Sequence, residues 1–303
     1  MVPAFPRDQS DTFMVPFIQQ FLASFVVNHP EVELLICPVF MPKGTPYVWN
    51  NIEVIPLNIK NNNLFQKLFS VINTIKKVIK IAEQNKVSGI LSFWYTESAL
   101  IGNIVAFFCK KPHFIWLQGQ DVKRTNKYMK YFRPNPNKLI ALSQFQNDFL
   151  FNEFNFKAKT IAPIIINPSL FPELNTNERT IDIFGAGSLI ALKNYDLFID
   201  VIAEIKKSYP NVKVALAGNG PLKSHLKKKI SELNLEDTIS LLGLLQHKSS
   251  LEYMNKAKTF LHTSSFEGGG AVIHEALYSG CKVVCTLPLV EKEDIPFLSL
   301  IHI

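Results

Sequence analysis

Two glutamates flank a glycine-rich stretch in the last part of this 303-residue sequence. Glu267 directly precedes the glycine run 268–270, and seven residues separate it from Glu275. Glycines allow the backbone to approach a ligand closely, and the helix that we expect after the run presents unpaired N–H groups to an anion. Carboxylates accept hydrogen bonds from hydroxyl groups. The stretch therefore predicts a site for a diphosphate that carries hydroxyl-bearing groups on both sides, as in a nucleotide-sugar.

A lysine earlier in the chain has the position of a phosphate-binding cation. The run Gly185-Ala186-Gly187 follows an apolar segment, and Lys193 precedes a helix expected over 194–208. A lysine at a helix start opposes the helix dipole, so capping does not explain it, whereas a bound phosphate does. The alternative is an exposed loop lysine. The third glycine and the acidic residue of a dinucleotide fingerprint are missing, so we do not expect a nicotinamide cofactor.

Short apolar runs alternate with segments of helical periodicity along the whole chain. Strands are expected over 32–39, 89–95, 113–117, 138–142, 180–184, 212–217, 238–242 and 259–263. Helices are expected over 13–28, 64–85, 97–109, 144–153, 194–208, 222–233 and 248–256. This alternation indicates βαβ units and parallel sheets covered on both faces. The segment 163–179 is rich in Asn, Pro and Glu and is the best linker candidate, so we predict an α/β protein with domains 1–170 and 171–303.

The net charge of +7 is unevenly distributed. Residues 1–170 hold 18 Lys and Arg against 10 Asp and Glu, whereas residues 171–303 hold 14 against 15. A basic first half favours phosphate-bearing or membrane-surface partners, although a solvated basic face is an equal alternative. The segment 64–85 could be a basic amphipathic helix on a membrane. A helix that packs on the sheet and keeps its lysines in water is the alternative that we favour.

The remaining composition argues against several other classes of protein. The four cysteines form no CxxC pair and no cluster with histidines, so we expect free thiols and no metal site. The longest apolar segment, Ala99 to Cys109, is too short to cross a bilayer, and no secretory leader is recognisable. We therefore expect a cytoplasmic protein, placed at the inner face of the membrane if the basic half binds lipid.

These motifs together resemble the "group 1" glycosyltransferases. The matching segments span roughly residues 180–286 and keep the order of that family: Lys193-Asn194, Gly218-Asn219-Gly220-Pro221, Leu242-Gly243, the stretch from Ser265 to Ala276, and Gly280-Cys281-Lys282-Val283-Val284. The resemblance implies the GT-B-like fold, in which two Rossmann-type βαβ domains face a central cleft. It assigns acceptor binding to residues 1–170 and nucleotide-sugar binding to residues 171–303.

The resemblance also implies roles for residues of the donor site. Lys193 would hold the diphosphate, Glu275 would accept from the ribose hydroxyls, and Glu267 would face the transferred sugar. The further donor contacts that we expect are Gly187, Gly218, Asn219, Gly243, Leu244, Gly268, Gly269, Gly270 and Ala271. The cation and the helix end would stabilise the phosphate leaving group, so no metal is required.

The N-terminal half supplies weaker candidates and departs from the family pattern. Gln118 stands where members often have a histidine, so it can hydrogen-bond a sugar hydroxyl but cannot shuttle a proton. Asp121 is the second candidate here, which makes Glu267, Lys193, Gln118 and Asp121 the predicted catalytic set. Asp11 and Arg7 are further candidates for substrate contacts. The C-terminal half has one departure as well: Ser188, five residues before Lys193, replaces an arginine that many members have. In the second half of the chain, His274 is expected to pack locally or to face solvent, with no catalytic role.

The resemblance predicts a glycosyltransferase of the hexosyltransferase type that retains anomeric configuration. Its donor would be UDP- or GDP-linked, its acceptor a glycan or lipid-linked sugar of surface polysaccharide synthesis, and it would need no cofactor and no nucleic acid. Two alternatives remain open: a sugar-nucleotide epimerase of the same fold, and an inactive nucleotide-sugar-binding module. We also expect the chain to be cut short at both ends, because the first strand is nearly absent and the family continues beyond Val284.

Overall fold

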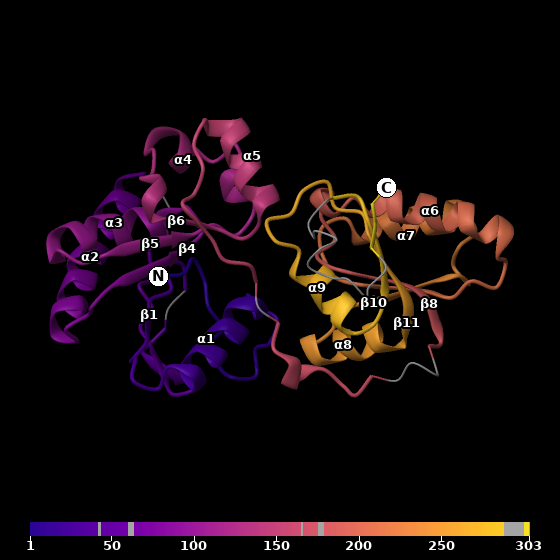
Figure 1. Ribbon diagram of the computed structural model, residues 1–303, viewed down its shortest axis with the longest axis horizontal. Coiled ribbons are helices and arrows are strands. Elements are labelled where there is room, and N and C mark those ends of the chain that lie inside the picture. The colour runs from indigo at the N-terminus through magenta and orange to yellow at the C-terminus, as the bar shows by residue number, and fades with distance from the viewer. Residues whose placement is uncertain (42–43, 60–63, 165, 175–178, 288–299, 303) are drawn as a thin grey trace. The chain divides into compact units, whose positions relative to one another are not determined.

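The computed structural model describes residues 1–41, 44–59, 64–164, 166–174, 179–287 and 300–302 (Figure 1). The chain divides into two compact units, Met1–Ile164 and Ile165–Ile303. The sequence placed this boundary after residue 170, inside the same linker. Both units combine helices with largely parallel sheets, which confirms the predicted α/β class.

The N-terminal unit contains five helices and seven strands among its described residues. The helices are α1 (Pro16–Asn28), α2 (Leu64–Gln84), α3 (Glu97–Cys109), α4 (Lys127–Tyr131) and α5 (Gln144–Phe154). The strands are β1 (Leu35–Ile36), β2 (Tyr47–Trp49), β3 (Ile52–Val54), β4 (Ile90–Phe93), β5 (His113–Trp116), β6 (Leu139–Ala141) and β7 (Thr160–Ile161). The expected strand over 32–39 is therefore much shorter, whereas α2 and α3 agree closely with their predicted ranges.

The first residues of the chain join two sheets of this unit. The sheets have the strand orders β1-β3-β2 and β4-β5-β6-β7, and only the β2–β3 pair is antiparallel. The Val2 N–H donates to the Cys37 carbonyl at 3.3 Å, next to β1. On the other side, the Phe93 N–H in β4 donates to the Met1 carbonyl at 3.0 Å. Residues 1–3 thus continue the sheet between β1 and β4, as expected for the end of a strand.

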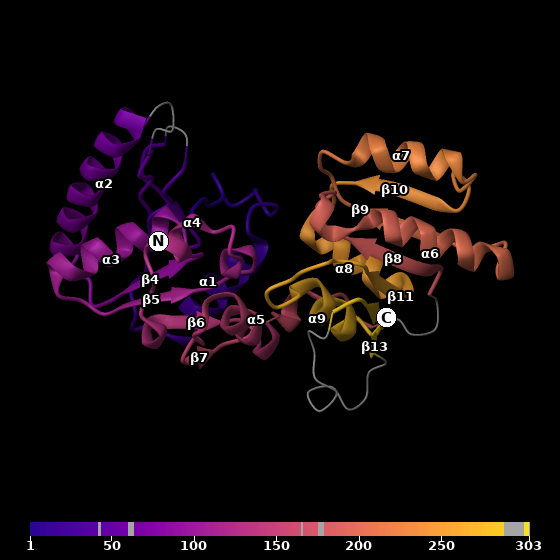
Figure 2. The ribbon, with the colours of Figure 1, turned by 90° about the horizontal axis from the view of Figure 1, so that it is seen from above.

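Apolar side chains cover both faces of the N-terminal sheet. Ile18 and Leu22 of α1 pack in one cluster with Phe93 and Trp116. On the opposite face a second cluster joins α2 to α3, and Figure 2 shows these two helices next to each other. Each buried aliphatic or aromatic side chain contributes about 1.5–3 kcal/mol. These contacts hold β4 and β5 in place, and the loop after β5 carries Gln118 and Asp121.

The C-terminal unit is a doubly wound sheet. Its strands are β8 (Ile181–Ala186), β9 (Val214–Ala217), β10 (Ile239–Gly243), β11 (Ala257–His262), β12 (Lys282–Cys285) and β13 (Leu300–His302). Its helices are α6 (Tyr195–Ser208), α7 (Lys223–Glu232), α8 (His247–Lys256) and α9 (Ala271–Tyr278). In Figure 1, α6 and α7 lie on one face of the strands and α8 and α9 on the other. The helices and strands predicted for this half of the chain are thus present.

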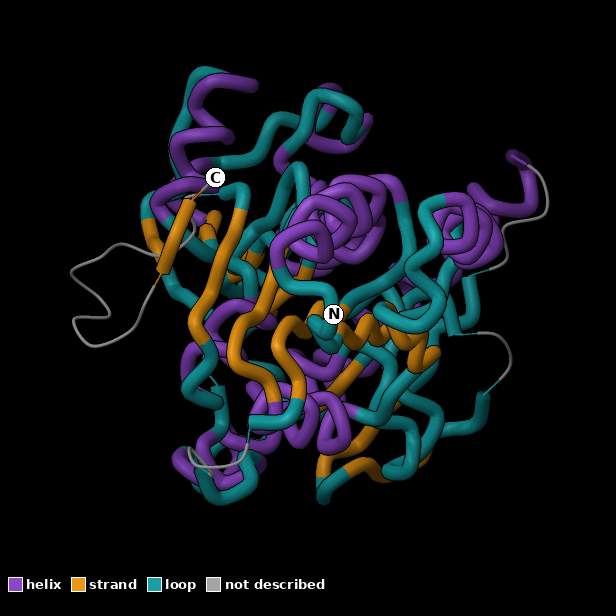
Figure 3. Tube along the Cα trace, turned by 90° about the vertical axis from the view of Figure 1, so that its right-hand side faces the viewer, coloured by secondary structure: helices purple, strands orange, loops and turns teal. Residues whose placement is uncertain are grey.

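The strand order locates a ligand crevice. The order is β10-β9-β8-β11-β12-β13, all neighbours are parallel, and Figure 3 shows strands of this sheet side by side. The winding direction reverses between β8 and β11. In open α/β sheets, ligands bind outside the carboxyl ends of the strands at such a reversal. The loops that leave β8 and β11 contain Lys193 and the Glu267 stretch.

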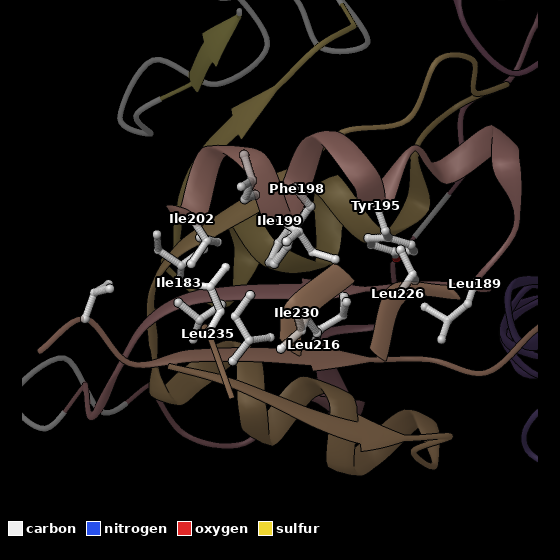
Figure 4. Close-up of a cluster of buried hydrophobic side chains, with 14 residues drawn as sticks. Ile183, Leu189, Tyr195, Phe198, Ile199, Ile202, Leu216, Leu226, Ile230 and Leu235 are labelled. Carbon is white, nitrogen blue, oxygen red and sulfur yellow. The ribbon is translucent and has the colours of Figure 1, made fainter. Parts of the chain in front are cut away.

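A large apolar cluster packs α6 and α7 against the strands from which these loops leave (Figure 4). Phe198, Ile199 and Ile202 recur at helical spacing on α6 and are fully buried. They pack with Leu216 of β9 and Leu226 of α7. The expected free thiols are present as well: Cys37, Cys281 and Cys285 are buried, and Cys109 is half-buried.

Candidate functional site

Lys193 lies in a short turn that is attached to the exit of β11. The turn Ala191–Lys193 is a 3-10 helix between β8 and α6. The Thr263 hydroxyl donates to the Lys193 carbonyl at 3.0 Å, and the Ser265 N–H donates to the Leu192 carbonyl at 2.9 Å. These bonds join segments that are about seventy residues apart in the sequence. They place the lysine opposite the predicted glutamate.

Lys193 and Glu267 form an ion pair. The lysine ammonium donates to Glu267 Oε1, and the two side chains are only 18% and 16% exposed. His262 Nε2 lies 3.2 Å from the same oxygen, and the Ser264 hydroxyl lies 3.1 Å from His262 Nε2. His262 itself is buried, and its Nδ1 has no hydrogen-bond partner among the described residues. The resemblance predicts separate ligand groups for Lys193 and Glu267, whereas in the structure the two side chains bind each other.

The environment of Glu267 keeps it charged. Burial raises its pKa, but the hydrogen bond from His262 and the charge of Lys193 outweigh this and lower the pKa to about 2. The carboxylate is therefore ionised across the physiological range. A dianionic diphosphate that approaches Lys193 competes with this carboxylate, and a sugar hydroxyl that approaches Glu267 can donate a hydrogen bond to a fully charged acceptor.

Two of the predicted donor glycines allow loops to touch. Gly218, after β9, has φ +152°, and a Cβ there would lie 1.9 Å from the Gly187 carbonyl oxygen. Gly187 has φ +155°, and a Cβ there would lie 2.8 Å from the Tyr195 hydroxyl. Both values lie in the region that favours glycine. The neighbouring Asn219 accepts from the Leu189 N–H at 2.9 Å through its carbonyl, so this loop is tied to the one after β8.

Glu275 has a histidine partner that the sequence did not indicate. Gly270 has φ +59° and precedes α9, where Ala271 is the first residue. Glu275, one turn further, has its Oε1 at 2.8 Å from Nε2 of His247, the first residue of α8. The side chains are 13% and 16% exposed. Sequence reasoning missed His247 because nothing in the spacing of 28 residues shows that α8 and α9 are neighbours.

The remaining donor candidates line the end of β10 and the start of α9. Gly243 ends β10 with φ +73°, and its carbonyl accepts from the Gly218 N–H at 2.8 Å. Leu244 follows it and is 59% exposed. Gly268 and Gly269 are buried between Glu267 and α9. The carboxyl ends of β8, β9, β10 and β11 thus bring all predicted donor residues to one edge of the C-terminal sheet.

In the N-terminal unit, Asp121 is fully engaged by the backbone. It is 5% exposed, and its carboxylate accepts from the N–H groups of Tyr95 at 2.9 Å, Gly119 at 2.8 Å and Gln118 at 3.1 Å. Burial raises the pKa of Asp121, while the three backbone N–H groups act to lower it. These contacts order the loop after β5, and they leave the carboxylate turned to the protein. A direct role of Asp121 in catalysis stays a prediction.

Gln118 has an unused acceptor, and Asp11 has local contacts. The Gln118 amide donates to the Trp116 carbonyl at 3.2 Å, whereas its buried Oε1 has no hydrogen-bond partner among the described residues. An orphaned buried acceptor is costly unless a ligand or water satisfies it. Asp11 Oδ1 accepts from the N–H groups of Phe13 and Met14 at 3.1 and 3.2 Å, so it shapes the turn before α1. Arg7 is exposed.

Two broader properties bear on the expected partners. Within the described ranges, no three His, Cys, Asp or Glu residues gather closely enough to hold a metal ion. None of the helices within these described ranges has the length and apolarity needed to cross a bilayer.

Residues 167–290 match the family described as "Glycosyl transferases group 1". The chain is 25% identical over 255 residues to the phosphatidylinositol N-acetylglucosaminyltransferase gpi3 subunit of Schizosaccharomyces pombe, which covers 80% of this chain and 56% of that protein. It is 38% identical over 104 residues to the N-acetylgalactosamine-N,N'-diacetylbacillosaminyl-diphospho-undecaprenol 4-alpha-N-acetylgalactosaminyltransferase of Campylobacter jejuni, which covers 34% of this chain and 27% of that protein. The chain thus spans about half or less of the length of these curated relatives.

Solved structures share the fold. A glycosyltransferase from Rickettsia africae superposes with a TM-score of 0.71 at 14% identity, over 100% of this chain and 83% of that one. The Anabaena protein HepE, solved with UDP and glucose, superposes with a TM-score of 0.61 at 20% identity, over 78% of this chain and 68% of that one. At these identities the likeness establishes the GT-B-like fold class and not the substrate.

Proposed function

We propose that this chain, which belongs to the group 1 glycosyltransferases through its C-terminal unit, transfers a sugar from a nucleotide-sugar donor to a glycan or lipid-linked acceptor. The observation that carries the proposal is the cluster of Lys193, Glu267 and His262 at the reversal point of the C-terminal sheet, with Glu275 on the helix that follows the Glu267 loop. A cation, a charged carboxylate and a second carboxylate at one sheet edge match the three parts of such a donor: diphosphate, sugar and ribose.

Each part of the donor then has a proposed partner. Lys193 binds the diphosphate after leaving Glu267, and the backbone N–H groups at the start of α9 add to its charge. Glu267 accepts a hydroxyl of the transferred sugar, and Glu275 accepts the ribose hydroxyls, oriented by His247. Leu244 borders the base. UDP is the first donor to test because the Anabaena neighbour was solved with UDP and glucose.

The proposed chemistry is assisted departure of the nucleoside diphosphate. Charge develops on the leaving phosphate as the bond to the anomeric carbon breaks, and fixed cations and N–H groups at that point lower the barrier. Loss of one such group costs about 10²–10³ in rate. Glu267, the carboxylate proposed to contact the transferred sugar, is a weak nucleophile because its pKa is lowered to about 2. We therefore propose that retention, if measured, arises from attack on the face that the leaving group vacates.

The proposed acceptor is lipid-linked or a glycan of surface polysaccharide. The Campylobacter relative is named for a diphospho-undecaprenol-linked substrate and the yeast relative for phosphatidylinositol. Unbalanced positive charge in the N-terminal half fits a substrate presented at an anionic membrane. Gln118, with its unused acceptor, is the group in that unit that we propose binds a hydroxyl of the reacting sugars.

Calorimetric titration of UDP- and GDP-sugars into the full chain tests the donor site. Wild type should bind one nucleotide class, and Glu275→Ala should weaken it roughly tenfold or more by leaving the ribose hydroxyls unpaired. His274→Ala is the matched control, since it changes the adjacent residue of the same helix. If wild type binds neither nucleotide, the donor assignment is wrong.

Product analysis separates the remaining candidates. Release of nucleotide only in the presence of acceptor supports glycosyl transfer. An isomerised sugar nucleotide without acceptor would instead show an epimerase. Tight donor binding with no turnover on lipid-linked or glycan acceptors would show an inactive binding module.

A further inference from the structure

A basic and aromatic segment follows directly after the loop that holds Gln118 and Asp121. Between residues 123 and 133 the chain carries five cations, no Asp or Glu, and two aromatic residues with high exposure. The cations are Lys123, Arg124, Lys127, Lys130 and Arg133. Tyr131 is 68% and Phe132 is 57% exposed. We call residues 123–133 the α4 surface, after the short helix at its centre.

The interior of the protein holds this segment in place. The Asn126 side-chain amide donates to the carbonyls of Asp121 and Tyr95, both at 2.8 Å, and its oxygen caps α4 at the Tyr128 N–H. The buried Tyr95 hydroxyl donates to the Phe132 carbonyl, and Met129 is fully buried. The backbone is therefore fixed from inside, whereas the side chains of Lys127, Lys130, Tyr131, Phe132 and Arg133 are exposed.

Among the described residues, Arg124, Lys127, Lys130 and Arg133 form no ion pair with a carboxylate. Glu153 of α5 lies next to Arg124: its carboxylate accepts from the Arg124 backbone N–H at 2.9 Å, and its carbonyl accepts from Arg124 Nε at 3.0 Å. The Lys130 ammonium lies 5.4 Å from the Tyr131 ring, and the Arg133 guanidinium lies 5.1 Å from the Phe156 ring. Next to α4 an open depression of about 460 Å³ is lined by Arg124, Lys130, Asn152, Glu153, Phe154 and Asn155. In Figure 1, α4 and α5 both lie at the top of this unit.

We propose that the α4 surface docks on the anionic face of a lipid bilayer. Aromatic side chains are enriched at the headgroup level of membranes, and lysine and arginine are attracted to anionic leaflets. Phe132 has no hydrogen-bonding group that would explain its exposure in water. Single-stranded nucleic acid also binds cations and aromatics, but it needs a series of stacking platforms along a groove, and the α4 surface offers two adjacent rings at the end of a one-turn helix.

The docking proposal rests on the proposed function, because a membrane contact at α4 would serve to present a lipid-linked acceptor. Asn126 connects the α4 surface to Asp121, three residues after Gln118. Docking at α4 therefore brings the bilayer to the loop that we propose binds the acceptor. An acceptor sugar attached to a lipid could then reach Gln118 while its lipid tail stays in the membrane.

Helix α2 is the competing surface within the same unit. It exposes Leu68, Phe69 and Ile72, followed by Lys76 and Lys80. The exposed Glu83 lowers the net positive charge of α2, whereas the α4 surface contains no acidic residue, so α2 is the less favoured site. Its lysines supply a matched pair of substitutions for the test.

Vesicle co-sedimentation tests the proposal with the full chain. The probes are vesicles of phosphatidylcholine alone and of phosphatidylcholine mixed with phosphatidylglycerol. Wild type should bind the anionic vesicles and lose binding as salt rises, because exposed charges are screened over about 10 Å at 0.1 M salt. The double substitution Lys127→Ala with Lys130→Ala should lower the partition about twenty-fivefold, at about fivefold for each lysine. Tyr131→Ser with Phe132→Ser should remove the binding that persists at high salt.

Two control pairs complete the design. Lys76→Ala with Lys80→Ala on α2, and Lys223→Ala with Lys227→Ala on α7, remove the same charge elsewhere and should change the partition less than threefold, by loss of net charge alone. Circular dichroism melts check that each exposed substitution leaves the chain folded. A larger loss for the α2 pair than for the α4 pair, or no binding to anionic vesicles, overturns the proposal. Binding of a single-stranded oligonucleotide without vesicle binding also overturns it.

Donor titration in the absence of vesicles keeps the two proposals separate. A chain that binds a nucleotide-sugar but not vesicles contradicts only the docking surface. A chain that binds vesicles through α4 but no nucleotide-sugar contradicts only the donor site.

Discussion

Two carboxylates, one in each unit, have little exposure to solvent and are stabilised in opposite ways. Glu267 in the C-terminal unit is paired with side chains, Lys193 and His262, and its pKa is lowered to about 2. Asp121 in the N-terminal unit is bound by three backbone N–H groups, and burial raises its pKa. Side chains can turn toward a ligand by rotamer changes, whereas backbone donors move only if the loop unfolds. Glu267 is thus suited to exchange partners, and Asp121 to hold a loop in one shape.

The largest expected effect is the loss of stability when Asp121, the acceptor of three backbone N–H groups, is removed. Asp121→Ala leaves the Tyr95, Gln118 and Gly119 N–H groups without an acceptor, and we expect the free energy of unfolding of the N-terminal unit to fall by about 4 kcal/mol. All three tryptophans, Trp49, Trp94 and Trp116, lie in this unit, so urea denaturation followed by their fluorescence reports it selectively.

The control for this loss is Asp148→Ala, an exposed carboxylate paired with Lys157, which should cost less than about 1 kcal/mol. If Asp121→Ala leaves stability intact but abolishes turnover, Asp121 is a substrate group, and the contrast with Glu267 is wrong.

The second effect is the loss of rate when Lys193, the ion-pair partner of Glu267, is removed. Lys193→Ala should lower the rate of nucleotide release about 10²–10³-fold, equivalent to about 3–4 kcal/mol, because it removes a cation from the leaving phosphate. Steady-state assays with saturating donor measure it. Lys258→Ala removes an exposed cation that pairs with Asp182 in the same unit and should leave the rate unchanged. Equal rates for Lys193→Ala and wild type would show that the lysine only neutralises Glu267.

The third effect is a pH dependence of stability. The folded-state pKa of Glu267, about 2, lies below its ordinary value of 4.5, so its pairing stabilises the fold above pH 4.5 and loses this contribution as pH falls toward 2. The shift corresponds to about 3 kcal/mol at most. The difference in unfolding free energy between wild type and Glu267→Gln, followed by circular dichroism, should shrink toward zero near pH 2. A constant difference from pH 7 to pH 2 would contradict the ion pair.

The smallest expected effect is the loss of kcat/KM when His262 can no longer hydrogen-bond Glu267. His262→Phe keeps a ring of similar size but removes the hydrogen bond to Glu267, at a cost of about 1 kcal/mol, or about fivefold in kcat/KM. His262→Gln can restore a donor and should recover part of the loss, which a purely steric role would not allow. Measured kcat and KM for the three proteins decide between them; the same activity in all three would show that Lys193 alone orients Glu267.

The sequence predicted the long helices with a clear apolar period, but it did not predict the shortest strands and helices. Helices α2 and α6 follow from apolar residues at helical spacing over 14 or more residues. The hairpin of β2 and β3 was missed because each strand has only three residues. A signal was present, since Asn50 and Asn51 with φ of 45° and 63° form the kind of two-residue turn that joins such strands. The five-residue helix α4 is too short to produce a period.

The site was predicted as a set of residues and not as a set of contacts. Order and spacing along the chain grouped Lys193, Glu267 and Glu275, and parallel-sheet topology brings them to one edge. The pairing of Lys193 with Glu267 and of Glu275 with His247 depends on which loops and helices become neighbours in space. These partners are 74 and 28 residues apart, and no local pattern reports such distances.

The reversal of winding between β8 and β11 also has a consequence for how such a protein can change over generations. The groups proposed to recognise the donor lie in loops and at helix starts beyond the strand ends, while the apolar cluster of Figure 4 lies between the sheet and α6 and α7. Substitutions of loop residues other than the paired Lys193 and Glu267 and the close-contact glycines can alter donor contacts while they leave this apolar cluster intact. Successive single substitutions in these loops can therefore change donor specificity while every variant along the way still folds.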